Sequence, residues 1–149
     1  MQSWFLDLSL LMAYWEGQGG GRTYHHTAPV NAMYGLHEAL LMVQEQGLEE
    51  SWEKHRTMHA ALHKSLSELG LEFVVDASYR LPQLNLVKVP EGIDEAAVRQ
   101  QLLKEYNLEI GAGLGAFAGK VWRIGLMGYS ARQENIQLCS SALKACLPA

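Results

Sequence analysis

The chain has 149 residues, of which 48% are hydrophobic and 19% charged, and its formal net charge is −4. This length is enough for one compact domain with a hydrophobic core. The acidic balance and the scattered lysines and arginines argue against a nucleic-acid-binding protein, which would carry a basic face. The longest apolar run, residues 8–15, is too short to cross a bilayer, and no secretory signal is predicted, so we expect neither a nucleic-acid partner nor a membrane.

The first half of the chain has helical spacing. Residues 4–15 predict a short apolar helix, which a glycine-rich loop follows. Pro29 is a favourable first residue for the next helix, in which apolar residues recur at helical spacing up to Gly47. Residues 48–69 then alternate apolar steps of four and three and predict another long helix.

From residue 71 onwards the apolar pattern changes to the alternation of strands. Four strands are predicted, at residues 71–75, 84–89, 108–110 and 121–127. Between the second and third strands, residues 94–106 predict a helix that ends at Asn107 and turns three apolar side chains inward: Val98, Leu102 and Leu103.

A last helix is predicted after the fourth strand. Ser130 and Gln133 have the spacing of a capping box, and one helix face carries Ile136, Cys139, Leu143 and Cys146. The two cysteines lie two turns apart on that face, too distant for a disulfide, which favours a reducing compartment. The order of elements predicts a small α/β (α+β) sandwich with helices in front of it.

The loop GGGRTYHHTAPV precedes the second helix and concentrates polar and aromatic residues. His25 and His26 are adjacent, so in an extended loop we expect their side chains to point apart, and the loop has no Asp, Glu or Cys to complete a metal site. The free N–H groups at a helix start favour an anion, to which Tyr24, Thr27 and the nearby Arg22 could donate hydrogen bonds. The pattern alone leaves a phosphate site and an ordinary loop open.

Two further patterns carry little chemistry. His55, His59 and His63 recur every four residues, but together they extend too far along one helix to share an ion, so we interpret them as structural. The stretch GAGLGAFAGK fits no nucleotide motif, because Ala116 replaces the third glycine of a dinucleotide loop and Val121 replaces the Ser or Thr of a phosphate loop. We interpret it as a mobile loop between strands.

Arg123 lies within the last predicted strand. Alternation places Trp122 and Ile124 on one face of that strand and Arg123 and Gly125 on the other. A buried arginine needs a carboxylate or phosphate partner. A salt bridge to a helix, exposure at an open face and capture of a substrate carboxylate all stay open on this pattern.

Several segments together resemble one family. The stretches YHHTAPV, EQGLEESWEKHR, LPQLNLV, LEIGAGLG and KVWRIGLMG have the order and spacing of the alanine–glyoxylate aminotransferase family, whose members are fold type I pyridoxal-phosphate enzymes and include serine–pyruvate aminotransferases. The resemblance implies the C-terminal small domain of a fold type I PLP-dependent transferase, preceded by helices of the large domain. On this basis residues 1–47 form the tail of the large PLP-binding domain and the connecting helix, and residues 48–149 form the small α/β domain.

The resemblance also assigns residues to a site. It implies that Tyr24 and Thr27 bind the phosphate of pyridoxal 5′-phosphate in the neighbouring subunit's active site, hence a homodimer, and that Arg123 holds the substrate α-carboxylate. In the family the lysine that attaches the cofactor lies N-terminal to everything in this sequence, and no lysine here stands in a matching motif. We therefore expect no catalytic residue, no covalently bound cofactor and no metal in this chain, and no activity of the chain alone.

Two functions remain open from the sequence. One is the C-terminal part of an aminotransferase that, when complete, moves an amino group from a small amino acid to glyoxylate or pyruvate. The alternative is a free-standing, non-catalytic domain derived from such a gene, acting in binding or self-association. A cytoplasmic location is expected: some family members are peroxisomal, but the sequence CLPA near the C-terminus is no peroxisomal signal.

Overall fold

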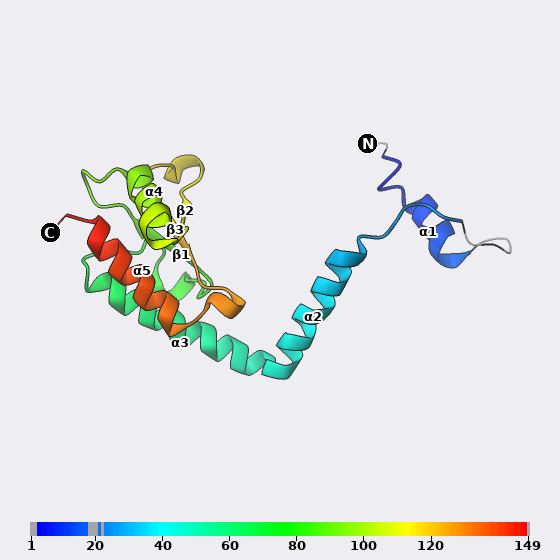
Figure 1. The fold of residues 1–149 in the computed structure, drawn as a ribbon, viewed down its shortest axis with the longest axis horizontal. Helices are drawn as coiled ribbons and strands as arrows, with labels where there is room; N and C mark the ends of the chain where they lie inside the picture. The colour runs from blue at the N-terminus through cyan, green and yellow to red at the C-terminus, as the bar shows by residue number, and fades with distance from the viewer. Residues whose placement is uncertain (1–2, 18–20, 22, 149) are drawn as a thin grey trace. The chain divides into compact units, whose positions relative to one another are not determined.

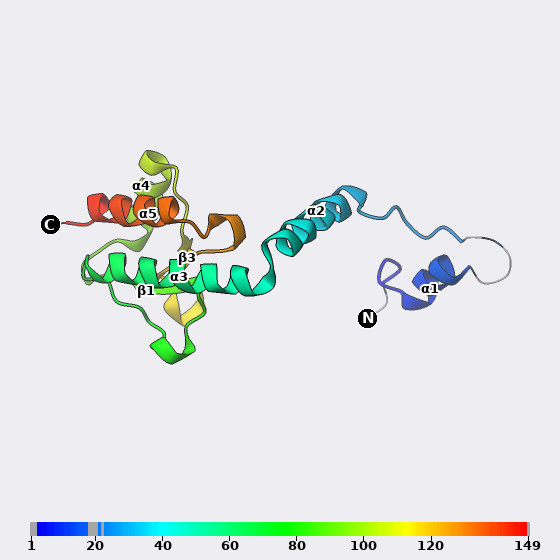
Figure 2. The same ribbon diagram turned by 90° about the horizontal axis from the view of Figure 1, so that it is seen from below.

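The structure is a computed structural model that describes residues 3–17, 21 and 23–148. The chain divides into two compact units, Met1–Glu45 and Gln46–Ala149. Figures 1 and 2 show their helices and strands in chain order. The domain boundary near residue 47 of a complete protein stays a prediction.

The first unit is built around two helices, α1 (Leu8–Glu16) and α2 (Val30–Gln46). The carboxylate of Asp7 caps α1 by accepting hydrogen bonds from the backbone N–H groups of Ser9 and Leu10, at 2.9 and 3.2 Å. Gly17 ends the helix in the left-handed conformation, with φ of 61°. Neither helix has a buried residue in this chain, and the apolar side chains that predicted them are half-buried or exposed.

The second unit places three helices against one sheet. The helices are α3 (Leu48–Ser67), α4 (Glu95–Tyr106) and α5 (Gln133–Cys146), and α5 contacts both of the others (Figure 1). The core between them and the sheet contains the most deeply buried side chains, Leu62, Leu66, Val87, Leu102, Trp122, Ile136 and Leu143. No helix in the described part of the chain is both long and apolar enough to cross a membrane.

The sheet has three antiparallel strands in the order β1-β3-β2: β1 (Leu84–Lys88), β2 (Gly111–Ala112) and β3 (Val121–Gly125). Trp122 and Ile124 of the central strand are buried on the face that the helices cover, and the indole N–H of Trp122 donates to the backbone carbonyl of Glu95 in α4 at 3.3 Å. The opposite face carries Leu86 and Arg123, which are half-buried. The alternation predicted for this strand is therefore confirmed.

Two predicted strands differ from the structure. Residues 71–75 follow the edge of β1 but form only an isolated bridge, between Phe73 and Val87, before the chain turns away at the 3-10 helix η1 (Ala77–Tyr79). The strand predicted at residues 108–110 is displaced into the glycine-rich stretch, where β2 pairs Gly111 with Arg123. A Cβ at Gly111 would meet the Arg123 side chain at an ordinary 3.4 Å, so the glycine avoids no clash there but leaves that side chain uncovered.

Two finer predictions are wrong. Ser130 does not cap the last helix: it lies in the 3-10 helix η3 (Gly128–Ser130), and the N-cap of α5 is Arg132, which makes no side-chain capping bond. Leu103 is 50% exposed instead of facing the core. It follows Leu102 directly, and a helix turns by about 100° per residue, so Leu102 points into the core and Leu103 to its side.

Candidate functional site

Tyr24 and Thr27 bring two hydroxyl groups together in the first unit. Their oxygen atoms are hydrogen-bonded to one another, and both side chains are exposed. The ring of Tyr14 in α1 meets the Tyr24 ring edge-on, with centroids 6.0 Å apart. One hydroxyl uses its hydrogen in this bond and the other keeps its hydrogen free, so the pair offers one O–H donor to an anion while the bond between them is intact.

The start of α2 lies beside this pair. The helix begins at Val30, one residue after the predicted Pro29. The backbone N–H groups of Asn31 and Ala32 have no acceptor among the described residues, and a hollow of about 490 Å³ is lined by residues 27–32. Two hydroxyls and free N–H groups at a helix start fit a phosphate chemically. The predicted third donor, Arg22, lies outside the described residues.

His25 and His26 contact each other, so the prediction that they point apart is wrong. Their Nδ1 atoms are 2.6 Å apart, and Nε2 of His25 is 3.0 Å from the carbonyl oxygen of Trp4. That carbonyl can only accept, so Nε2 of His25 carries hydrogen, and one of the two Nδ1 atoms donates to the other. The Trp4 indole also stacks on His25, with centroids 4.2 Å apart, and leaves it 7% exposed. The segment around Trp4 folds against this loop and contacts both histidine rings.

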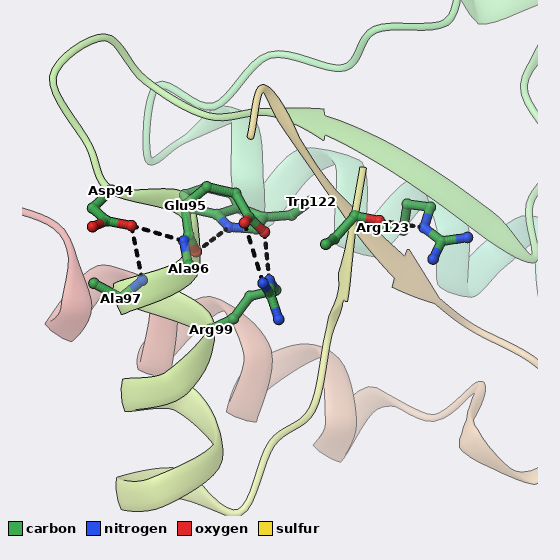
Figure 3. A network of polar contacts seen from close by, with 8 residues as sticks. Asp94, Glu95, Ala96, Ala97, Arg99, Trp122 and Arg123 are labelled. Carbon is green, nitrogen blue, oxygen red and sulfur yellow. Dashed lines mark hydrogen bonds and ion pairs between the residues drawn. The ribbon is translucent and has the colours of Figure 1, made fainter. Parts of the chain in front are cut away.

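Arg123 lies in the middle of the central strand, between Leu86 of β1 and Gly111 of β2. Its Nε donates a 2.6 Å hydrogen bond to the carbonyl oxygen of Ala112 (Figure 3). Within the described residues the guanidinium forms no ion pair, so the predicted alternative of a salt bridge to a helix is not what the structure shows. Its terminal nitrogens remain able to hold both oxygens of one carboxylate.

A polar network behind Arg123 holds β3 against α4 (Figure 3). Glu95 is buried and pairs with Arg99, with Nε and Oε1 2.5 Å apart, and this hydrogen-bonded partner raises the pKa of Arg99. The backbone carbonyl of Glu95 accepts from Trp122, the neighbour of Arg123. Asp94 caps α4 through two backbone N–H groups, each at 3.0 Å. The network therefore anchors the buried side of the strand that carries Arg123.

The three helix histidines contact different parts of the second unit. His55 bonds to the backbone at Gly128, His59 to the side chain of Asn85, and the ring of His63 lies 4.8 Å from that of Phe73. The structural interpretation is thus confirmed. Across the described residues no three His, Cys, Asp or Glu side chains gather as a metal site. Asn85, which is 2% exposed, was missed by sequence reasoning because its apolar neighbours dominate the strand pattern.

The sequence matches a known protein family over most of its length. Residues 9–138 match the family described as aminotransferase class-V. An alanine–glyoxylate aminotransferase of Callithrix jacchus is 46% identical over 146 residues, which are 97% of this chain and 35% of the relative. A (S)-ureidoglycine–glyoxylate transaminase of Bacillus subtilis is 41% identical over 143 residues, covering 96% of this chain and 34% of the relative.

A solved structure agrees with these sequence matches. The crystal structure of an alanine–glyoxylate aminotransferase from Nostoc sp. matches with a TM-score of 0.88 at 44% identity, covering 98% of this chain and 38% of that chain. The resemblance and the fold class predicted from the sequence are confirmed. The chain spans about a third of the length of the curated relatives it matches.

Proposed function

The chain belongs to the aminotransferase class-V family, and on that premise we propose that it forms the C-terminal part of a pyridoxal-phosphate-dependent aminotransferase. The complete enzyme transfers the amino group of a small amino acid to glyoxylate or pyruvate. The observation that carries the proposal is Arg123, a guanidinium in the central strand whose one described partner is the carbonyl of Ala112. The names of two relatives, which are glyoxylate aminotransferases, support the choice of acceptor.

Arg123 binds and orients the substrate in this proposal. Its planar guanidinium matches the two oxygens of a carboxylate. The bond from Nε to Ala112 restricts how the side chain can turn. A carboxylate bound at the terminal nitrogens then has a fixed position and a fixed orientation. A reaction at the neighbouring α-carbon requires both.

Tyr24 and Thr27 hold the cofactor phosphate in this proposal. The free O–H of the hydroxyl pair and the free N–H groups of Asn31 and Ala32 offer three donors to one phosphate, and the exposure of both side chains suits a cofactor in a neighbouring subunit. When bound, pyridoxal phosphate supplies an electron sink for bond changes at the substrate α-carbon. The residues of this chain bind and orient, while the lysine that attaches the cofactor belongs to the remainder of the enzyme.

A homodimer is part of the same proposal. In the first unit, large apolar side chains are exposed along α2, including Met33, Leu36, Leu40 and Val43. A helix that is apolar over so much of its circumference is normally covered by neighbouring protein. A second subunit, together with the remainder of the enzyme, provides that cover.

A fusion protein tests the proposal. The N-terminal part of the Nostoc relative is joined to this chain at Trp4, so that the chain replaces the matching region of that enzyme. We expect transfer of the amino group from alanine to glyoxylate, and weaker retention of pyridoxal phosphate when Tyr24→Phe and Thr27→Val are introduced together. The control pair is Tyr34→Phe with Thr23→Val, which removes hydroxyls at two other exposed positions. A folded, cofactor-loaded fusion with no activity contradicts the proposal.

A free-standing domain for self-association is the second candidate, and the exposed apolar side chains of α2 favour it. The mass of the natural gene product separates the two candidates. A product near 16.6 kDa, the mass of this chain, supports the free-standing domain. A product about three times as large, with a cofactor-binding region upstream, supports the aminotransferase, since the chain covers 35% of a curated relative.

A further inference from the structure

Strand β3 is supported unequally on its two edges. β1 pairs with all five residues of β3, whereas β2 pairs only with Trp122 and Arg123. Beyond Arg123, neither Ile124 nor Gly125 has a strand neighbour on the β2 side within the described residues. A strand end that is paired on one edge only opens more easily than a fully paired one. β1 and the backbone bond from Leu126 to the carbonyl oxygen of Gln83 hold one edge of this strand end, and contacts from α3 support it further.

The first such contact joins α3 to the turn after β3. His55 is 7% exposed, and its Nδ1 donates to the carbonyl oxygen of Ser51 at 2.6 Å. Its Nε2 accepts the backbone N–H of Gly128 at 3.0 Å. Nε2 can accept only in the neutral imidazole, so one ring satisfies a donor and an acceptor at once. Lys54 adds a 3.2 Å bond to the carbonyl oxygen of Gly128, so α3 holds both backbone groups of this residue.

The second contact joins α3 to β3 through β1. Nδ1 of His59 lies 2.7 Å from the side-chain oxygen of Asn85. The amide nitrogen of Asn85 donates to the carbonyl oxygens of Pro82 and Ile124, each at 3.3 Å. The side-chain oxygen of Asn85 can only accept, so Nδ1 of His59 donates to it. The direction of each hydrogen bond from His59 through Asn85 to Ile124 is therefore fixed. This series of hydrogen bonds ends at Ile124, the residue directly after Arg123.

We propose that His55 and His59 are positioning residues for Arg123. They fasten the chain at Ile124, on the edge that β1 pairs, and at Gly128, and so add support to a strand end that β2 does not reach. With both ends of this segment fixed, the backbone of Arg123 keeps the place at which its Nε reaches Ala112. The expected effect on the binding of a carboxylate rests on the function proposed above for Arg123. The expected effect on the position of the Arg123 side chain does not depend on that function.

Uniformly ¹⁵N-labelled full chain provides two independent readouts by NMR. The signal of the Arg123 Nε–H group reports its hydrogen bond to Ala112, and the exchange rate of the Gly128 amide hydrogen reports the contact with His55. Titration with pyruvate, as a small carboxylate probe, measures what these contacts do for binding. Failure of pyruvate to bind the unaltered chain would count against the function of Arg123, while the two signals would still test its positioning.

His55→Phe keeps an aromatic ring in place and removes both nitrogens. We expect the Gly128 amide to exchange about tenfold faster, the Arg123 Nε–H signal to shift and broaden, and pyruvate binding to weaken by about threefold to tenfold. His55→Gln retains an acceptor and should recover most of each effect. His63→Phe is the matched control, because it makes the same change on the same helix at a residue that contacts Phe73 instead.

The outcomes separate positioning from simple stabilisation. A folded His55→Phe chain whose Arg123 Nε–H signal and pyruvate affinity match those of the unaltered chain overturns the proposal. Equal effects from His63→Phe also overturn it, because they would come from a general loss of stability. If His55→Phe does not fold, Lys54→Met decides the question at the exposed side of Gly128. A smaller shift of the Arg123 Nε–H signal in that variant supports the proposal, and an unchanged signal overturns it.

Discussion

Arg123 and Ala112 are joined across the β3–β2 pair by a 2.6 Å hydrogen bond from the guanidinium Nε to the backbone carbonyl oxygen. This bond occupies the one guanidinium nitrogen nearest the backbone and leaves the terminal pair for another partner. The residue that pairs with Arg123 on that edge is Gly111, which has no side chain to cover the guanidinium. The sheet thus presents Arg123 for binding on the face opposite the helices.

Replacement of Gly113 by alanine should destabilise the second unit strongly. A Cβ at this position would stand 2.0 Å from the carbonyl oxygen of Phe117 and 2.9 Å from a side-chain carbon of Val121. We expect the free energy of unfolding, measured with urea, to fall by about 3 kcal/mol. Gly111→Ala is the control, since its Cβ would meet its nearest neighbours at an ordinary 3.4 Å. Equal stability of the two variants would show that the turn near Phe117 is not as closely packed as described.

The two cysteines should differ sharply in reactivity. Cys139 is buried, and burial raises the pKa of its thiol to about 12. Cys146 is only half-buried, although burial and then the charge of Glu105 also raise its pKa. Because the thiolate is the reactive form, iodoacetamide at pH 8 should modify Cys146 first and leave Cys139 intact until the chain is unfolded. Mass spectrometry of the native and the denatured chain measures this, and equal rates in the native chain would contradict it.

Mild acid should weaken the second unit through His63. Burial, and then the charges of Arg80 and His59, lower its pKa below the usual 6.5. The unfolded chain therefore binds a proton more readily, so the stability contributed by neutral His63 is present above pH 6.5 and is lost as the pH falls. We expect the difference in unfolding free energy between pH 7.5 and pH 5 to be smaller in His63→Gln. The carboxyl groups of Glu72 and Asp76 have pKa values below their ordinary values of 4.5 and 3.8. Their contribution to the stability is therefore lost mainly in stronger acid, below this pH range.

The isolated chain should self-associate through α2. Met33 and Leu40 are 56% and 59% exposed, and such side chains are usually covered in a folded protein. Light scattering at high concentration should give a mass above 16.6 kDa, and Met33→Lys with Leu40→Lys should lower it. Gln44→Lys adds a charge to the same helix without removing an apolar group and serves as the control. A monomeric unaltered chain would contradict the expectation.

The helices could be predicted well from the sequence because their signals are local. The spacing of apolar residues predicts α3 and α4, and Asn107 ends α4 in the left-handed conformation with φ of 50°, as expected for a residue that tolerates it. The shorter strands could not be predicted in place. β2 has two residues, Gly111 and Ala112, which give no alternation, and its position depends on the partner strand.

The position of a site residue could be predicted where it depends on a single strand or helix. Alternation placed Arg123 on the face away from the core, and the helix start placed Thr27 beside free N–H groups. The roles of these residues came from the family resemblance. The bond between His55 and Gly128 spans 73 positions in the chain, and no periodicity in either segment indicates it. The contact between His25 and Trp4 escaped prediction for the same reason.

The measurement that tests this account most directly is the steady-state kinetics of the fusion protein with Arg123→Lys. Lysine keeps the charge but cannot hold both oxygens of a carboxylate, so we expect kcat/KM for alanine and for glyoxylate to fall by about tenfold to a hundredfold. Arg56→Lys, at an exposed arginine paired with Glu53, should leave both values unchanged. An active fusion in which Arg123→Lys alters neither value would show that Arg123 does not hold the substrate carboxylate.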